Sequence, residues 1–419
     1  MKITSPSSLD IHAPSNVVVK ILFFLAIYVY IFQPPIINKA IYVVVNMFFL
    51  GFFILTKTKK FFSYIKCLRF EICIAFSIVL ISVLRDFFSG DIVYSDRFLV
   101  WFFQSLIFPV FVIYYFSKYY GNDYNKSNNF IKLIYYVVVL AAFLTLLLMI
   151  FPPFDNFYKS IQLDDYYERY KNWEFRYRAY GISENLTFTY GYLLGLFAAF
   201  SLLKIKDGFH HFFFFLLLTI GTAFNARIGF FPIIFALLYL ITIGFNIKFF
   251  SLSIIAFIPA FVIFFTYFTE LEEFLTWPLK FFEEILNFFS SGNGGTANTL
   301  LDDFIIVPNN PIELIFGQGV SLFGLESGSS DMGYILQLNY AGVFFVFLII
   351  NFLLLCCTNL YIRIGYRHCF FWMFSFSVFL LNTKGFFLAA TPGARLLFLI
   401  YCYYIVSNAD FLKFSKKSC

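Results

Sequence analysis

Long apolar runs, separated by short polar or charged segments, recur from one end of the chain to the other. Each run approaches the roughly 20 residues that a helix needs to cross the hydrocarbon core of a bilayer. We therefore predict an all-α integral membrane protein, a single domain over residues 1–419 containing about twelve transmembrane helices. The predicted spans are 17–32, 37–55, 70–84, 98–116, 133–151, 186–203, 211–224, 229–245, 249–268, 334–357, 369–382 and 396–407.

Two of the polar segments are longer than turns. Residues 152–183 are dense in aromatic and charged side chains. Residues 269–333 begin with apolar residues at helical spacing interleaved with glutamates, a pattern that suits a helix lying in the membrane interface. Glycines in the later part favour an irregular loop there. We name these segments the first loop and the large loop.

The distribution of charge orients the predicted spans. Assigning connections alternately to the two sides places 18 of the 30 Lys and Arg residues, but only 5 of the 24 acids, on one side. Lys and Arg resist translocation, so this side is expected to be cytoplasmic. Both termini are then cytoplasmic, and both loops lie on the opposite, outer side of the membrane. The polar first residues lack a small-residue cleavage site, so we expect 17–32 to be retained as a span.

Composition changes this picture little. Only 13% of residues are charged, against about 25% in soluble domains. The net charge of +6 is explained by the excess of Lys and Arg on the predicted cytoplasmic side, so no nucleic-acid partner is expected. No Cys/His spacing indicates zinc, and phosphate-loop, GxSxG and HExxH motifs are missing. We expect neither metal nor cofactor. All four histidines fall on the predicted cytoplasmic side.

Arg227 is the clearest candidate for chemistry, because it lies between two very apolar predicted helices with no acid nearby in the sequence. A charge inside a membrane is costly and usually functional. One interpretation is a guanidinium clamp for a diphosphate. The alternative is a short interfacial turn whose arginine extends to water or headgroups. The two helices around it could also form a single re-entrant hairpin.

Further cations lie on the same predicted face. Arg176 and Arg178 directly precede a span, and Lys384 and Arg395 bracket the last outer turn. Together with Arg227 they could form a positive pocket that binds diphosphate or glycan. The structural alternatives are ion pairs within the first loop for the first two and ordinary anchoring for the other two.

The candidate acids are Glu184 and Asp331, with Glu326 and the pair Asp302-Asp303 beside them. Glycosyl transfer needs a base, or an acceptor that orients a sugar hydroxyl, and a carboxylate can serve. The alternative for Asp331 and Glu184 is capping of the helices that they precede. We predict Arg227, Glu184 and Asp331 as the catalytic set.

The pattern resembles bacterial O-antigen polymerases of the Wzy type in its hydrophobic length, medium first loop and larger later loop. Four stretches carry the resemblance: Arg178-Ala-Tyr-Gly-Ile-Ser-Glu-Asn185, Asn225-Ala-Arg-Ile-Gly229, Phe316-Gly-Gln-Gly319 with Ser329-Ser-Asp-Met-Gly333 and Ala341-Gly342, and Asn382-Thr-Lys384. The large loop departs from the family, since it contains Lys280 but no arginine.

The resemblance implies a metal-independent glycosyltransferase of the integral-membrane GT-C kind, with both loops on the periplasmic side of a bacterial inner membrane. It would transfer a growing glycan from one undecaprenyl diphosphate to the terminal sugar of a second lipid-linked repeat unit. The lipid diphosphate would be the leaving group, with Arg227 and Arg178 stabilising its charge. Implied partners are the lipid-linked glycan donor and acceptor, membrane lipids and a protein that regulates chain length.

Two other functions fit the same architecture. O-antigen ligases share it, but their large loop carries a functional histidine, which residues 269–333 lack. A flippase for the same lipid-linked units would be a transporter. Transporters of this kind usually show paired halves, whereas this sequence has no evident internal repeat.

Overall fold

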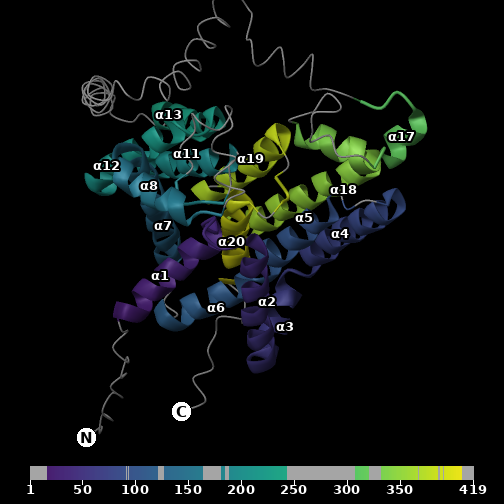
Figure 1. Ribbon diagram of the computed structural model, residues 1–419, viewed down its shortest axis with the longest axis horizontal. Coiled ribbons are helices and arrows are strands. Elements are labelled where there is room, and N and C mark those ends of the chain that lie inside the picture. The colour runs from purple at the N-terminus through teal and green to yellow at the C-terminus, as the bar shows by residue number, and fades with distance from the viewer. Residues whose placement is uncertain are drawn as a thin grey trace, which may run out of the picture.

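The computed structural model describes residues 17–90, 92, 94–120, 127–163, 181–184, 188–242, 307–319, 332–366, 368–385, 387–389 and 391–407. Within these residues the chain is helical and contains no strand (Figure 1). Five helical stretches in this part are long and apolar enough to cross a membrane, and further apolar helices are shorter. The chain is thus a helical membrane protein, as predicted, while the number of spans stays a prediction.

Helices occupy every predicted span that falls within the described residues, and the span at 249–268 lies outside them. The helices before the first loop are α1 (Val17–Phe32), α2 (Lys39–Thr56), α3 (Thr58–Cys67), α4 (Arg69–Ser89), α5 (Ser95–Trp101), η1 (Phe102–Ile107), α6 (Pro109–Tyr120) and α7 (Ser127–Ile150). The later ones are α8 (Pro152–Ile161), α11 (Phe188–Leu203), η3 (Ile205–Asp207), α12 (His210–Ala223), η4 (Arg227–Gly229), α13 (Phe230–Thr242), α17 (Pro311–Phe316), α18 (Gly333–Ile364), α19 (Cys369–Lys384) and α20 (Pro392–Ser407).

Besides the large loop, whose later part was predicted to be irregular but contains α17, two segments predicted as connections contain α-helices. The basic segment between the second and third spans forms α3, and the first loop begins with α8, which has proline in its first turn. Each has one buried aromatic residue, Tyr64 in α3 and Tyr158 in α8. A short amphipathic helix of this kind is stabilised by tertiary packing rather than by its own propensity, so hydropathy alone did not identify it.

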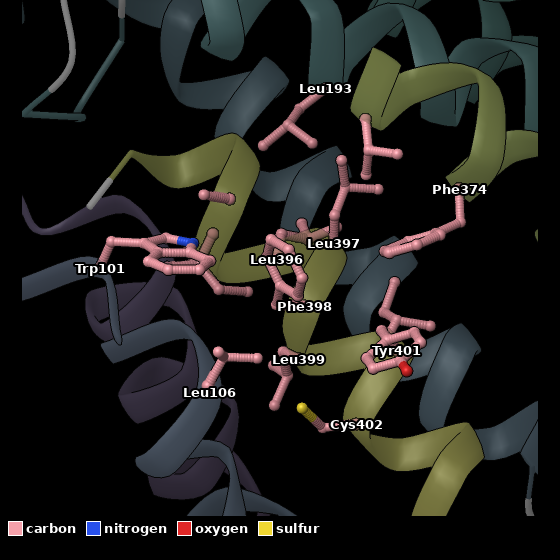
Figure 2. Close-up of a cluster of buried hydrophobic side chains, with 14 of the residues drawn as sticks. Trp101, Leu106, Leu193, Phe374, Leu396, Leu397, Phe398, Leu399, Tyr401 and Cys402 are labelled. Atoms are coloured by element: carbon pink, nitrogen blue, oxygen red, sulfur yellow. The ribbon is translucent and has the colours of Figure 1, made fainter. Parts of the chain in front are cut away.

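Helix α20 lies at the centre of the bundle (Figure 1), and every residue from Pro392 to Val406 is buried. Figure 2 shows side chains of α5, η1, α11 and α19 around it, among them Trp101 and Phe374. Trp101 packs edge-on against Phe398 at 5.8 Å, and Phe374 stacks on Tyr401 at 5.1 Å between ring centroids. A helix that is apolar all round fits either lipid or a protein interior, so only the packing reveals its central place.

The span at 98–116 contains a π-helical segment, η1, between α5 and α6. The wider turn leaves carbonyl groups without the usual partners inside the helix. Tyr30 donates its hydroxyl to Gln104 O and Tyr64 donates to Leu106 O, each at 2.5 Å. The π-helix therefore ties α1 and α3 to this span, and it turns Gln104 into the protein interior, where it is 1% exposed.

Helix α18 is broken at Gly342, whose φ of 82° is non-helical. A Cβ there would lie 2.0 Å from Ile315 O, so the position requires glycine. The break leaves carbonyls for other donors: Gln318 N–H bonds Asn339 O at 2.6 Å, and Arg85 Nε–H bonds Tyr340 O at 3.2 Å. Through these contacts α17 and the residues after it are seated on α18.

Candidate functional site

Three helices begin, and two end, at one common end of the bundle. A Cβ on Gly385, just after α19, would touch the ring of Phe188 at the start of α11. A Cβ on Gly393, in the first turn of α20, would lie 3.0 Å from Thr189 Cβ. A Cβ on Gly333, the first residue of α18, would lie 2.2 Å from Gly385 O. We call this region, which also receives the C-terminus of α1, the Glu184 end.

The four described residues before α11 fix the position of Glu184. Glu184 N–H donates to Phe32 O at 2.9 Å, at the C-terminus of α1. Ile182 O accepts the hydroxyl of Tyr28 at 2.9 Å. Gly181 has a φ of 58°, and a Cβ there would collide with Thr145 Oγ1 of α7. Glu184 is thereby placed over the end of α1 by contacts with α1 and α7.

Arg395 points from the first turn of α20 into the same place, where it is completely buried. It donates to Glu184 Oε1 from Nη2 at 2.5 Å and to Gln104 Oε1 from Nη1 at 3.2 Å. Its Nε and Nη2 also donate to Ile31 O at 2.9 and 2.7 Å. A guanidinium at carbonyls of a helix C-terminus interacts favourably with the helix dipole. Arg395 thus caps α1 and holds Glu184.

The two oxygens of Glu184 have different surroundings. Oε1 is bound by Arg395, whereas Oε2 has no hydrogen-bond partner among the described residues. Lys39 Nζ, at the start of α2, lies 3.4 Å from Oε2 and its side chain is 51% exposed. The Glu184 residue itself is 7% exposed. The carboxylate is therefore anchored through one oxygen, with the other oxygen beside a half-exposed cation.

The predicted Arg227 turn is packed against α11 instead of lying on its own between two helices. The backbone of η4 meets α11 through glycines: a Cβ on Gly195 would lie 1.8 Å from Gly229 O, and one on Gly191 would lie 2.7 Å from Ala226 N. Small residues let two backbones approach this closely. The structure describes the backbone of Arg227, and places it along α11, the helix that follows Glu184.

Of the other predicted site residues, the structure describes only Lys384. Lys384 is the last residue of α19, partly exposed and adjacent to Gly385. Arg176, Arg178 and Asp331 lie outside the described residues. The N-cap position of α18 is Met332, with no side-chain cap hydrogen bond. The structure therefore brings Glu184 and Arg395 into contact and puts the Arg227 backbone and Lys384 on elements around α11.

Sequence reasoning missed two contributors, Lys39 and Gln104. Gln104 is a polar residue inside a predicted span, which is a usable signal because such residues are costly in a membrane. Lys39 was the one basic residue near the turn between the first two spans. The sequence alone does not predict that either side chain faces the Glu184 end.

The site offers an oriented carboxylate, an ammonium group and the starts of three helices, α11, α18 and α20. Helix N-termini carry partial positive charge that favours anions. Within the described part of the chain, no group of three or more His, Cys, Asp or Glu side chains could hold a metal ion. The arrangement suits a hydroxyl-bearing substrate that also carries negative charge.

No family model, curated protein or solved structure matches this chain.

Proposed function

We propose that this protein joins undecaprenyl-diphosphate-linked oligosaccharide repeat units into polysaccharide, as an O-antigen polymerase does. In this proposal the bundle is GT-C-like, with about twelve spans, both termini in the cytoplasm and the Glu184 end at the periplasmic face of the inner membrane. The observation that carries the proposal is the Arg395–Glu184 pair, with Glu184 Oε2 left without a hydrogen bond beside Lys39.

The proposed reaction transfers a glycan from lipid diphosphate to a sugar hydroxyl. The acceptor oxygen bonds to the anomeric carbon of the donor glycan as the bond between that carbon and the diphosphate oxygen breaks. Glu184 Oε2 accepts the hydrogen bond, and then the proton, of the acceptor hydroxyl. The diphosphate leaves with the bonding electron pair.

The leaving diphosphate needs positive partners, and here the structure refines the sequence assignment. The guanidinium of Arg395 is engaged by Glu184, Gln104 and the end of α1. We therefore assign Arg395 as a positioning residue for Glu184. Lys39 and Arg227, with Arg176, Arg178 and Lys384, are the proposed contacts of the diphosphate and glycan, together with the helix starts.

The test is deletion of the gene in the host, followed by separation of its surface polysaccharide on a gel. A polymerase defect leaves polysaccharide capped with a single repeat unit. Glu184→Gln should fail to restore long chains while the protein remains in the membrane. Long chains restored by Glu184→Gln would remove this carboxylate from the reaction.

A flippase for the same units is the second candidate, because α18 is broken at Gly342 and discontinuous helices often form the substrate sites of transporters. Deletion of a flippase would abolish all polysaccharide. A ligase, the third alternative, would leave long chains that are not attached to the cell surface. The same gel therefore separates the three functions.

A further inference from the structure

The turn between α1 and α2 contains a buried glutamine whose side chain has no hydrogen-bond partner among the described residues. Gln33 is 0% exposed, and neither its Nε2 nor its Oε1 has a hydrogen bond among the described residues. It is also the only non-glycine residue in the described chain with a positive φ, 43°. Residues other than glycine adopt this conformation rarely. The fold thus holds an unfavourable backbone that buries an unsatisfied carboxamide.

A second glutamine in the same condition lies on a segment that is hydrogen-bonded to the same turn. Gln162, the residue that ends α8, is 8% exposed, and both polar atoms of its side chain lack partners in the described part. The next residue, Leu163, donates its N–H to Pro35 O at 3.1 Å. This bond joins the end of α8 directly to the turn that carries Gln33.

Glu184 Oε2 completes the set, because Glu184 N–H is bonded to Phe32 O, next to Gln33. Three chain segments, tied together by two backbone hydrogen bonds, therefore carry five buried polar atoms without hydrogen bonds in the described part. One of them, Glu184 Oε2, has an ion pair with Lys39 at 3.4 Å, and the four carboxamide atoms have no polar partner there. Two of the five are amide donors and three are oxygen acceptors. Buried polar groups in folded proteins are almost always paired, so this concentration indicates a ligand.

The composition of the set identifies the chemistry of that ligand. An anion such as phosphate would leave the three acceptors unsatisfied, and a metal ion would leave the two amide donors unsatisfied. A hydroxyl both donates and accepts. Adjacent hydroxyls on a sugar ring present these functions at neighbouring positions, so a ring with several hydroxyls can pair with both carboxamides and the carboxylate.

We propose that Gln33, Gln162 and Glu184 Oε2 form a sugar-binding subsite for the terminal residue of the acceptor glycan. This inference rests on the proposed polymerase function for the identity of the sugar. The two glutamines bind hydroxyls that do not react, and they bring the reacting hydroxyl to Glu184. They are specificity-determining residues, whereas Glu184 contacts the reacting atom.

Gln33→Gly and Gln162→Leu are the decisive variants. Glycine keeps the positive φ at position 33 and removes only the carboxamide. Leucine at 162 retains much of the volume without polar atoms. Gln33→Asn, which tolerates a positive φ, keeps a shorter amide. Gln318→Leu is the matched control, because Gln318 is exposed and its amide is bonded to Glu313 at 2.8 Å.

The assay uses purified protein in lipid vesicles and single lipid-linked repeat units extracted from the deletion strain. Removing each glutamine should raise KM about tenfold, the effect of one lost hydrogen bond, and lower kcat less than about threefold. Gln33→Asn should be intermediate, and Gln318→Leu should match the wild type. Unchanged KM in both Gln33→Gly and Gln162→Leu would mean that the glutamines bind water only, which overturns the subsite and leaves the polymerase proposal standing.

A binding measurement tests the sugar subsite even if the polymerase proposal fails. Saturation-transfer NMR with oligosaccharide fragments of the host polysaccharide, released by mild acid, does not require turnover. Transfer to wild type and Gln318→Leu, with loss in Gln33→Gly and Gln162→Leu, supports the subsite even if gene deletion leaves the polysaccharide unchanged. Equal transfer to all four proteins, or none to the wild type, overturns it. Melting temperatures in detergent within a few degrees of wild type would show that the variants are folded.

Discussion

Helix α20 contributes to two buried carboxylates, and they are stabilised in opposite ways. Glu184, 7% exposed, is paired with Arg395 of α20 and lies near Lys39. Glu71 of α4, 1% exposed, instead accepts the hydroxyl of Tyr401 of α20 at 2.6 Å and the amide of Asn359 at 2.8 Å. No cation of the described residues forms an ion pair with Glu71.

The difference separates a site suited to chemistry, at Glu184, from a purely structural contact between helices, at Glu71, which we call the structural tie. Glu71 joins three helices, since its partners Asn359 and Tyr401 lie on α18 and α20, and both bonds are made to Oε1. Glu184 is charge-compensated, and its second oxygen lies beside a half-exposed ammonium group. A carboxylate that reacts must meet its substrate, so the arrangement of Glu184 fits the proposed transfer.

The largest expected effect comes from removing the cation at the Glu184 end. Arg395→Met leaves Glu184 buried without its partner, and breaking a buried pair in this way costs about 3–5 kcal/mol. We expect this loss in the free energy of unfolding, measured by denaturant titration in detergent, together with loss of polymer.

The double variant Arg395→Met, Glu184→Leu tests whether charge compensation is the cause. Replacing a buried ion pair by apolar residues is often nearly neutral, so the double variant should recover much of the lost stability but no activity. A double variant as unstable as the sum of the two single ones would show that the pair is not coupled.

Removing the carboxylate at the other site should cost less. Glu71→Leu leaves the Tyr401 hydroxyl and the Asn359 amide without their acceptor, a loss of about 1–3 kcal/mol for each group. Part of this loss is offset because the variant also removes the buried charge, whereas Arg395→Met leaves one uncompensated. Glu71→Gln retains an acceptor oxygen and should be clearly more stable than Glu71→Leu in the same titration. Both variants should still make polymer if enough protein folds. Loss of polymer in a stable Glu71→Gln protein would contradict a purely structural role.

The contrast between these two sites was only partly predictable from the sequence. Hydropathy located the long apolar helices, since any apolar run must be buried in lipid or in protein, but not the short helices α3 and α8. Arg395 stood out as a cation on the acidic outer face and Glu184 as a candidate base, but periodicity gives no distances between elements far apart in sequence. The pairing requires the close approach of α11 to α20 at Gly393, which no local pattern indicates.

Other features depended on backbone geometry that the sequence does not reveal. Gln33 adopts a positive φ although no glycine marks the turn. The carbonyls of the π-helix that contains Gln104 accept tyrosine hydroxyls from α1 and α3, which are tertiary contacts. Glu71 lies at the start of the predicted span 70–84, where hydropathy does not indicate that it is buried and bonded to α18 and α20.

A smaller change at the structural tie removes one donor and nothing else. Tyr401→Phe keeps the ring that stacks on Phe374 at 5.1 Å and leaves Asn359 as the donor to Glu71. A hydrogen bond to a charged group contributes about 1.5–3 kcal/mol, and a neutral one about 1 kcal/mol. We expect a loss of about 1–2 kcal/mol, below that of Glu71→Leu. Equal losses would mean that Asn359 contributes nothing measurable.

The smallest effect on stability is expected at Lys39. Its ammonium group is 3.4 Å from Glu184 Oε2 and its side chain is half-exposed, so water and salt screen the pair. Lys39→Met should lower the free energy of unfolding by about 0–1 kcal/mol, and this difference should shrink further as salt is added. A loss as large as that of Arg395→Met would show that Lys39 shares the charge compensation of Glu184. A stable variant with reduced turnover would instead place the ammonium group in contact with the substrate, because Arg395 alone then suffices to hold the carboxylate.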